Sequence, residues 1–136
     1  MEKSQELLQV LKTLTILYIE DEDAIRNEMT KVLQLLTKEV FAYSNAKDGY
    51  KGYTQKKPDM ILSDISLGGE SGIEFSKKVR TIDKQIPIIL LSAHTDTSYL
   101  LDAARLKLVA YLTKPINFGF TNLIQFLMSS SFPKGK

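Results

Sequence analysis

The chain has 136 residues, of which 43% are hydrophobic and 25% charged, with a formal net charge of +2 and no cysteine. This length suits one globular domain with its own core, and the lack of cysteine excludes disulfides, thiolate catalysis and cysteine-based metal sites. The basic residues are scattered, and no apolar run approaches the roughly 18 residues of a membrane span. We therefore expect a cytoplasmic domain that contacts neither nucleic acid nor a membrane directly.

Short apolar runs divide the sequence and are separated by stretches with helical spacing. They lie near residues 15–19, 39–43, 60–63, 88–92 and 110–113. Continuous apolar runs predict strands that are buried on both faces, as in a parallel sheet with helices on each side. The second run alternates more, which is typical of an edge strand. The predicted fold is an α/β, doubly wound, five-stranded parallel sheet of order 2-1-3-4-5, the flavodoxin-like arrangement.

Helix start signals follow several of these runs. Asp23, Asn45 and Ser71 each stand where a side chain can cap the first turn of a helix, and Glu74 follows Ser71 at the spacing of a capping box. Helices are therefore predicted over residues 24–36, 46–55, 72–80, 97–105 and 118–128.

Acidic residues stand where two of the predicted strands end. Glu20 and Asp21 follow the first run, and Asp64 follows the third. Because parallel strands of an open α/β sheet end on the same edge, these carboxylates are predicted to meet in one pocket. Mg²⁺ prefers oxygen ligands and is commonly held by one or two carboxylates plus a phosphate oxygen. The sequence thus predicts a Mg²⁺ site, beside which Ser92 and Lys114 at the ends of the last two strands suit the handling of a phosphoryl group.

Short motifs at the ends of these strands carry a resemblance to a known family. They are Tyr18-Ile19-Glu20-Asp21-Glu22, Leu62-Ser63-Asp64-Ile65, Leu90-Leu91-Ser92-Ala93 and Tyr111-Leu112-Thr113-Lys114-Pro115. In this order they make the chain similar to the receiver domains of two-component response regulators. The resemblance implies that Asp64 accepts a phosphoryl group from a histidine kinase or histidine phosphotransferase. It implies no dedicated enzyme, only weak self-phosphorylation from small donors and self-dephosphorylation.

The resemblance also implies a ligand set and catalytic partners. Mg²⁺ is expected to be bound by Glu20, Asp21, Asp64 and the backbone carbonyl of Ser66. Lys114 and Ser92 are expected to act with Asp64 in phosphoryl transfer, each contacting the oxygens of the transferred group.

Further implied roles concern the response to phosphorylation. Ser92 and Tyr111 are expected to form a switch, in which the hydroxyl moves toward the phosphoryl oxygen and the aromatic ring turns inward. Ser66 and His94 are expected to flank the path of the hydrolytic water and so to modulate dephosphorylation. For His94, a loop histidine without a role is the plainer interpretation.

The domain division follows from the same resemblance. Residues 13–128 are expected to form the receiver domain, and 129–136 a tail or the start of a linker, as in part of a larger regulator, transcriptional or otherwise. Residues 1–12 are an amphipathic extension, expected to be helical; packing on the domain, a contact between two copies and a frayed leader all stay open. The expected output surface, formed by residues 97–105, 110–113 and 118–128, could also carry a homodimer or simply pack internally.

Other functions are weighed against this one. A degenerate receiver that acts only as a protein-interaction module is opposed by the presence of Asp64, Lys114 and Ser92. A phosphatase with an aspartate nucleophile would need a second acid two positions later, where Ser66 stands. A nucleotide-binding domain would need a phosphate cradle after the first strand, where the acidic residues 20–22 repel phosphate.

Overall fold

The computed structural model describes residues 2–92 and 109–113, which form one five-stranded sheet with four helices around it. The strands are β1 (Thr15–Ile19), β2 (Glu39–Tyr43), β3 (Met60–Asp64), β4 (Ile88–Ser92) and β5 (Val109–Thr113). The helices are α1 (Glu2–Leu11), α2 (Asp23–Leu36), α3 (Ala46–Lys56) and α4 (Gly72–Ile82). The helices expected over residues 97–105 and 118–128 lie outside the described residues.

All strand pairs are parallel, and the spatial order is β2-β1-β3-β4-β5. The predicted topology is therefore confirmed, including the place of β2 at an edge. The order reverses between β1 and β3. From β1 the chain crosses to β2 on one side, and from β3 it crosses to β4 on the other. In such sheets ligands bind outside the carboxyl ends of the strands at this switch point.

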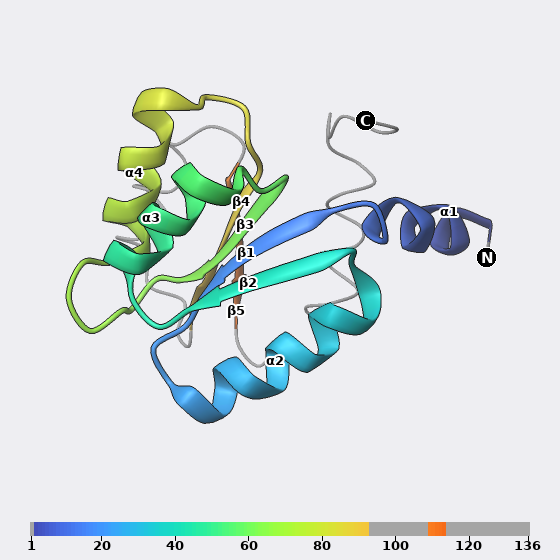
Figure 1. Ribbon diagram of the computed structural model, residues 1–136, viewed down its shortest axis with the longest axis horizontal. Coiled ribbons are helices and arrows are strands. Elements are labelled where there is room, and N and C mark those ends of the chain that lie inside the picture. Colours follow the sequence, from blue (N-terminus) through green and yellow to red (C-terminus); the bar gives the residue numbers. More distant parts are fainter. Residues whose placement is uncertain (1, 93–108, 114–136) are drawn as a thin grey trace.

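Helices cover both faces of the sheet, with α3 and α4 on one face and α2 on the other (Figure 1). Successive side chains of a strand point to opposite faces, so each strand contributes to two cores. On β1, Leu17 and Ile19 belong to the core under α3 and α4, whereas Ile16 and Tyr18 belong to the core under α2. This double burial explains why the strands read as continuous apolar runs.

Two of the three predicted caps are confirmed. Asn45 accepts a hydrogen bond from the backbone N–H of Asp48 at 2.8 Å, and the Ser71 hydroxyl accepts one from Glu74 N–H at 3.1 Å. The cap at Asp23 is wrong, because α2 begins at Asp23 itself and the N-cap residue is Glu22, which makes no side-chain cap. The Asp23 carboxylate instead accepts a hydrogen bond from Arg26 at 2.7 Å.

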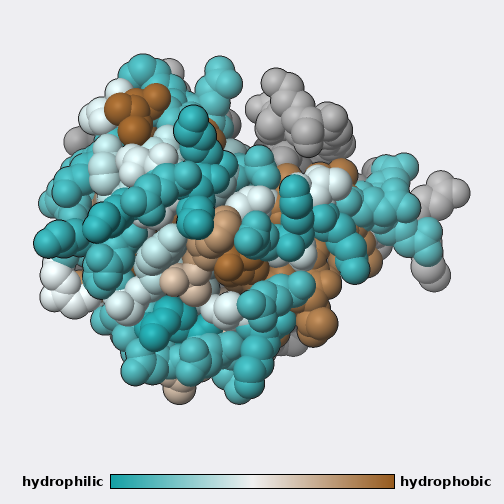
Figure 2. All heavy atoms as spheres, viewed as in Figure 1, coloured by the Kyte–Doolittle hydropathy of each residue, from teal (hydrophilic) through white to brown (hydrophobic). Residues whose placement is uncertain are grey.

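The extension before β1 is helical and contacts the domain through its end. Leu11 is 1% exposed and packs in the α2-side core together with Leu14, while Leu8 is 37% exposed. Apolar side chains reach the surface where α1 and the end of α2 approach one another (Figure 2). Leu35, near the end of α2, is 76% exposed. Within residues 2–92 and 109–113, no helix is both long and apolar enough to cross a membrane.

Candidate phosphoacceptor site

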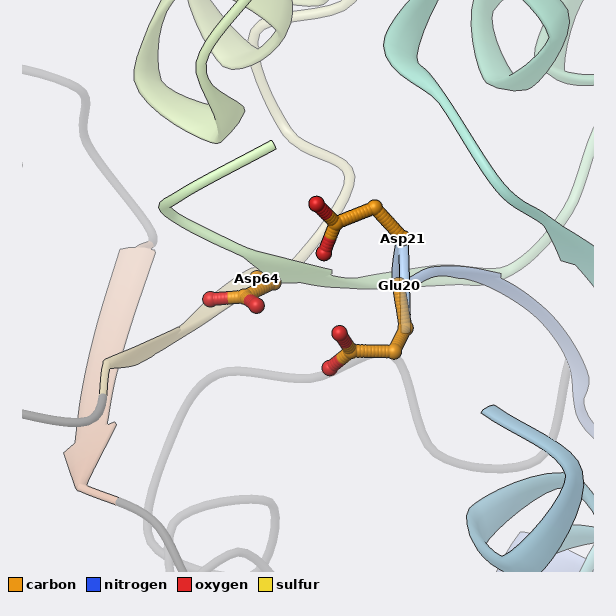
Figure 3. Close-up of side chains that lie close together, drawn as sticks. All are labelled: Glu20, Asp21 and Asp64. Carbon is orange, nitrogen blue, oxygen red and sulfur yellow. The ribbon is translucent and has the colours of Figure 1, made fainter. Parts of the chain in front are cut away.

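Three carboxylates meet at the carboxyl edge of the sheet. Glu20 and Asp21 follow β1 and Asp64 ends β3, and an oxygen of each lies within 4.8 Å of the others. They surround a common space in Figure 3, with two side chains coming from the β1 segment and the third from β3. Glu20 is 0% and Asp64 4% exposed, whereas Asp21 is exposed. The pocket therefore has a buried floor and one acid at its open side.

Backbone amides hold two of these carboxylates in place. Glu22 N–H donates to Glu20 Oε2 at 3.1 Å, and Ser66 N–H donates to Asp64 Oδ1 at 3.3 Å. Ser66 itself is exposed and lies in the loop that leaves β3. Each bond ties a carboxylate to the first residues of its own loop, so the loops and the acids form one unit.

Gly72, the first residue of α4, lies directly against the backbone of Asp64. Its N–H donates to Ile65 O at 2.8 Å, and a Cβ at this position would overlap the carbonyl oxygen of Asp64. A side chain here would force β3 and α4 apart, because a backbone atom cannot yield as a flexible side chain does. Glycine therefore allows α4 to begin immediately beside the proposed phosphoacceptor.

A cation also reaches this edge of the sheet from α2. Arg26 Nη1 donates to the backbone carbonyl of Glu20 at 2.9 Å, and Arg26 Nη2 donates to Asp23 Oδ1 at 2.7 Å. The side chain of Arg26 is only 19% exposed, compared with 83% for Asp23. Arg26 was not predicted from the sequence as a residue of this site. Its spacing from Asp23 suggests a helical ion pair, but its contact with Glu20 depends on the path of the loop.

The electrostatic field of the acids is felt by Tyr18, which is fully buried on β1. Burial raises the pKa of its hydroxyl well above the ordinary value, and the negative charges of Glu20 and Asp64 raise this pKa further, while Arg26 opposes them. Tyr18 is therefore a neutral group at physiological pH.

Of the other expected site residues, the structure describes the backbone of Ser92 and Tyr111. Ser92 ends β4 and pairs in register with Thr113, the last residue of β5, while Asp64 pairs with Leu91. The backbone of Ser92 thus lies on β4, next to β3, and that of Tyr111 on β5, one strand further from Asp64. Lys114 and His94 lie outside the described residues.

The donor set fits a hard divalent cation. Mg²⁺ takes oxygen ligands, and carboxylates this close to one another repel, so a cation between them lowers their free energy. The three acids supply that set from two neighbouring strands. Their chemistry suits Mg²⁺ rather than metals that favour thiolate or imidazole ligands.

A family model described as the response regulator receiver domain matches residues 16–125. The chain belongs to this family. The match includes all three acids, most of β1 and the whole of β5. The receiver domain is a signalling domain, and the chain is thus a receiver domain of the two-component response regulators.

Similar proteins agree with this assignment. Over 102 residues the receiver domain is 33% identical to the transcriptional regulatory protein AfsQ1 of Streptomyces coelicolor, covering 75% of this chain and 45% of AfsQ1. It is 32% identical over 107 residues to the phosphate regulon transcriptional regulatory protein PhoB of Pseudomonas aeruginosa, covering 76% of this chain and 46% of PhoB. The chain thus spans less than half the length of these two curated relatives.

A solved structure shows the same fold. The response regulator protein TrrA of Thermotoga maritima, crystallised in complex with Mg²⁺ and BeF, has a TM-score of 0.72 and 25% identity, with 83% of this chain and 98% of that chain covered. The flavodoxin-like receiver fold predicted from the sequence is confirmed by this likeness together with the sheet order.

Proposed function

We propose that Asp64 is the phosphoacceptor of this receiver domain and that Mg²⁺ is held by Glu20, Asp21, Asp64 and the backbone carbonyl of Ser66. The observation that carries this proposal is the convergence of three carboxylates within 4.8 Å at the switch point of the sheet. Bound there, Mg²⁺ would supply positive charge that offsets the charge of an arriving phosphoryl group.

The chain's own residues account for the transfer. A carboxylate oxygen of Asp64 attacks phosphorus, and the bond from phosphorus to the donor breaks, which leaves an acyl phosphate on Asp64. Phosphoryl transfer needs mainly alignment and charge stabilisation, so little else is required of the protein. The Ser66 N–H bond to Asp64 Oδ1 fixes the orientation of the attacking carboxylate.

The other implied residues complete the proposal. Lys114 neutralises phosphoryl oxygens and Ser92 donates its hydroxyl to one of them, and the pull on Ser92 lets Tyr111 turn inward as the switch. Ser66 and His94 flank the hydrolytic water. What supports these assignments is the shared edge on which β3, β4 and β5 end, together with the family's chemistry.

The phosphoryl donor, the output surface and the cellular compartment are part of the same proposal. A histidine kinase or histidine phosphotransferase in the cytoplasm supplies the phosphoryl group, in keeping with the absence of cysteine. Phosphorylation then alters the surface formed by residues 97–105, 110–113 and 118–128, through which a homodimer or an effector is contacted. The length of relatives such as AfsQ1 supports a place within a larger, transcriptional regulator.

Intact-mass spectrometry after incubation with acetyl phosphate and Mg²⁺ tests the proposal. The wild-type chain is expected to gain one phosphate, and Asp64→Asn none. Asp48→Asn is the matched control, since it removes an exposed carboxylate in the first turn of α3, and it should gain phosphate as the wild type does. A wild-type chain that gains no phosphate would instead favour a module that acts only through protein contacts.

A further inference from the structure

Arg26 makes contacts that bear on how the acids are held. Its guanidinium joins two points of the chain, the backbone carbonyl of Glu20 and the carboxylate of Asp23. The first point precedes the loop and the second is the first residue of α2. Arg26 therefore ties the helix to the residue from which the loop departs.

The bonded carbonyl belongs to the peptide unit between Glu20 and Asp21. A peptide unit is planar, so fixing its carbonyl oxygen fixes the orientation of the plane that joins the two α-carbons. The amide on the other side of Glu20 is also fixed, because Glu20 N–H donates to Tyr43 O of β2 at 3.0 Å. The backbone of Glu20 is thus held from β2 on one side and from α2 on the other.

We propose that Arg26 is a positioning residue that sets the direction of the Glu20 and Asp21 carboxylates for Mg²⁺. This inference rests on the proposed function, in which those carboxylates bind the ion. Arg26 donates to a backbone oxygen and to Asp23, and it acts on the ion only through the backbone it orients.

If Arg26 acted only through its charge, its removal would change the Mg²⁺ affinity in the opposite direction. A guanidinium near a divalent cation repels it, so removing the positive charge should tighten Mg²⁺ binding if Arg26 were only a neighbouring charge. If Arg26 positions the acids, its removal should weaken binding despite the lost repulsion. The sign of the change in Mg²⁺ affinity therefore separates the two roles.

Calorimetric titration with Mg²⁺ measures that sign in the intact chain. For Arg26→Gln we expect weaker binding by about tenfold, the lower end of what outer partners of metal ligands contribute. Arg26→Lys keeps the charge but loses the fork that reaches both oxygens, so it should also weaken binding. Affinity that is unchanged or tighter in both variants would overturn the proposal.

Further variants guard against a loss of fold or a general charge effect. Asp23→Asn removes the exposed anchor of Arg26 and should weaken binding less than Arg26→Gln does; in the double variant it should add nothing further. Lys78→Gln removes a cation paired with Glu70 at 3.1 Å and should not weaken binding. Thermal unfolding in EDTA reports whether each variant is folded, and Arg26→Lys, which keeps the charge, carries the test if Arg26→Gln is not folded.

Phosphorylation gives a second readout. In Arg26→Gln the Mg²⁺ concentration for half-maximal phosphorylation by acetyl phosphate should rise, while the rate at saturating Mg²⁺ stays near that of the wild type. A lower saturated rate with an unchanged Mg²⁺ requirement would contradict a positioning role. If the wild type itself binds no Mg²⁺, the proposed function fails and this inference with it, whereas wild-type binding with unaffected variants rejects the inference alone.

Discussion

Acids lie both at the edge of the sheet where the strands end and at the opposite edge where they begin, and their surroundings differ. At the carboxyl edge, Glu20, Asp21 and Asp64 crowd within 4.8 Å. At the opposite edge the Asp83 carboxylate accepts bonds from Gln85 N–H and Ile86 N–H, both at 3.0 Å, and from the Tyr53 hydroxyl at 3.3 Å. At the carboxyl edge several negative charges lie together, whereas at the opposite edge the charge of Asp83 is stabilised by hydrogen-bond donors of the protein.

Arg80 adds to the hydrogen-bond network at the opposite edge. At the opposite edge Arg80 donates to the backbone carbonyls of Asp83 and Ile86 at 3.0 and 2.8 Å, which closes the turn between α4 and β4. Burial lowers the pKa of Arg80, and the charge of Asp83 opposes this shift. The network around Asp83 is therefore complete within the protein, as expected of a structural turn. The carboxyl edge instead keeps like charges together, which is costly unless a cation joins them.

The largest effect should follow from removing one acid of the cluster. Asp21→Asn takes away a carboxylate ligand, so Mg²⁺ affinity should fall by roughly tenfold or more. In EDTA the same variant should unfold at a higher temperature than the wild type, because one source of like-charge repulsion is gone. Calorimetry and thermal unfolding measure the two effects. Asp83→Asn serves as the comparison at the other edge and should leave Mg²⁺ affinity unaltered.

The close approach of α4 to the acid cluster should be the next most sensitive feature. A Cβ on Gly72 would overlap the Asp64 carbonyl oxygen, so Gly72→Ala should lower the free energy of unfolding by about 1–3 kcal/mol. Gly69→Ala in the loop before α4 is a matched control, since nothing lies within 4 Å of a Cβ added there. Urea unfolding compares the two variants. Equal stabilities would show that α4 can move away from Asp64 at little cost.

A smaller loss is expected at the opposite edge. Tyr53→Phe removes the hydroxyl that donates to Asp83 Oδ2, so the free energy of unfolding should fall by about 1 kcal/mol. Incorporation of phosphate from acetyl phosphate should be unaffected. Impaired phosphorylation in this variant, at normal stability, would mean that the two edges are coupled rather than independent.

The smallest effect concerns alkaline pH. Burial, aided by the charge of Asp83, raises the pKa of Tyr53 from its ordinary value of about 10 to about 12. Since the unfolded chain loses this proton first, the contribution of Tyr53 is fully present below about pH 10 and is lost as pH rises toward 12. Stability measured across this range should therefore fall less steeply in Tyr53→Phe than in the wild type. Parallel curves would contradict the shift.

Local patterns were enough to predict the strands, their order and the meeting of the acids, because continuous apolar runs and parallel topology fix where strand ends lie. These patterns did not predict the contacts and helix boundaries that depend on the path of the backbone. Asp23 resembles an N-cap residue, yet α2 begins at Asp23 itself and Glu22 takes the N-cap position. The contact of Arg26 with Glu20, and that of Tyr53 with Asp83 thirty positions away, depend on the folded loops and leave no spacing signal.

The central claim is that one carboxylate of the crowded edge, Asp64, becomes phosphorylated. Borohydride reduction of the chain after acetyl phosphate treatment, followed by peptide mass mapping, tests it directly, because this reduction converts an aspartyl phosphate to homoserine. The account predicts homoserine at the position of Asp64 when Mg²⁺ is present, and none in EDTA. Homoserine at another aspartate, or equal conversion with and without Mg²⁺, would contradict it.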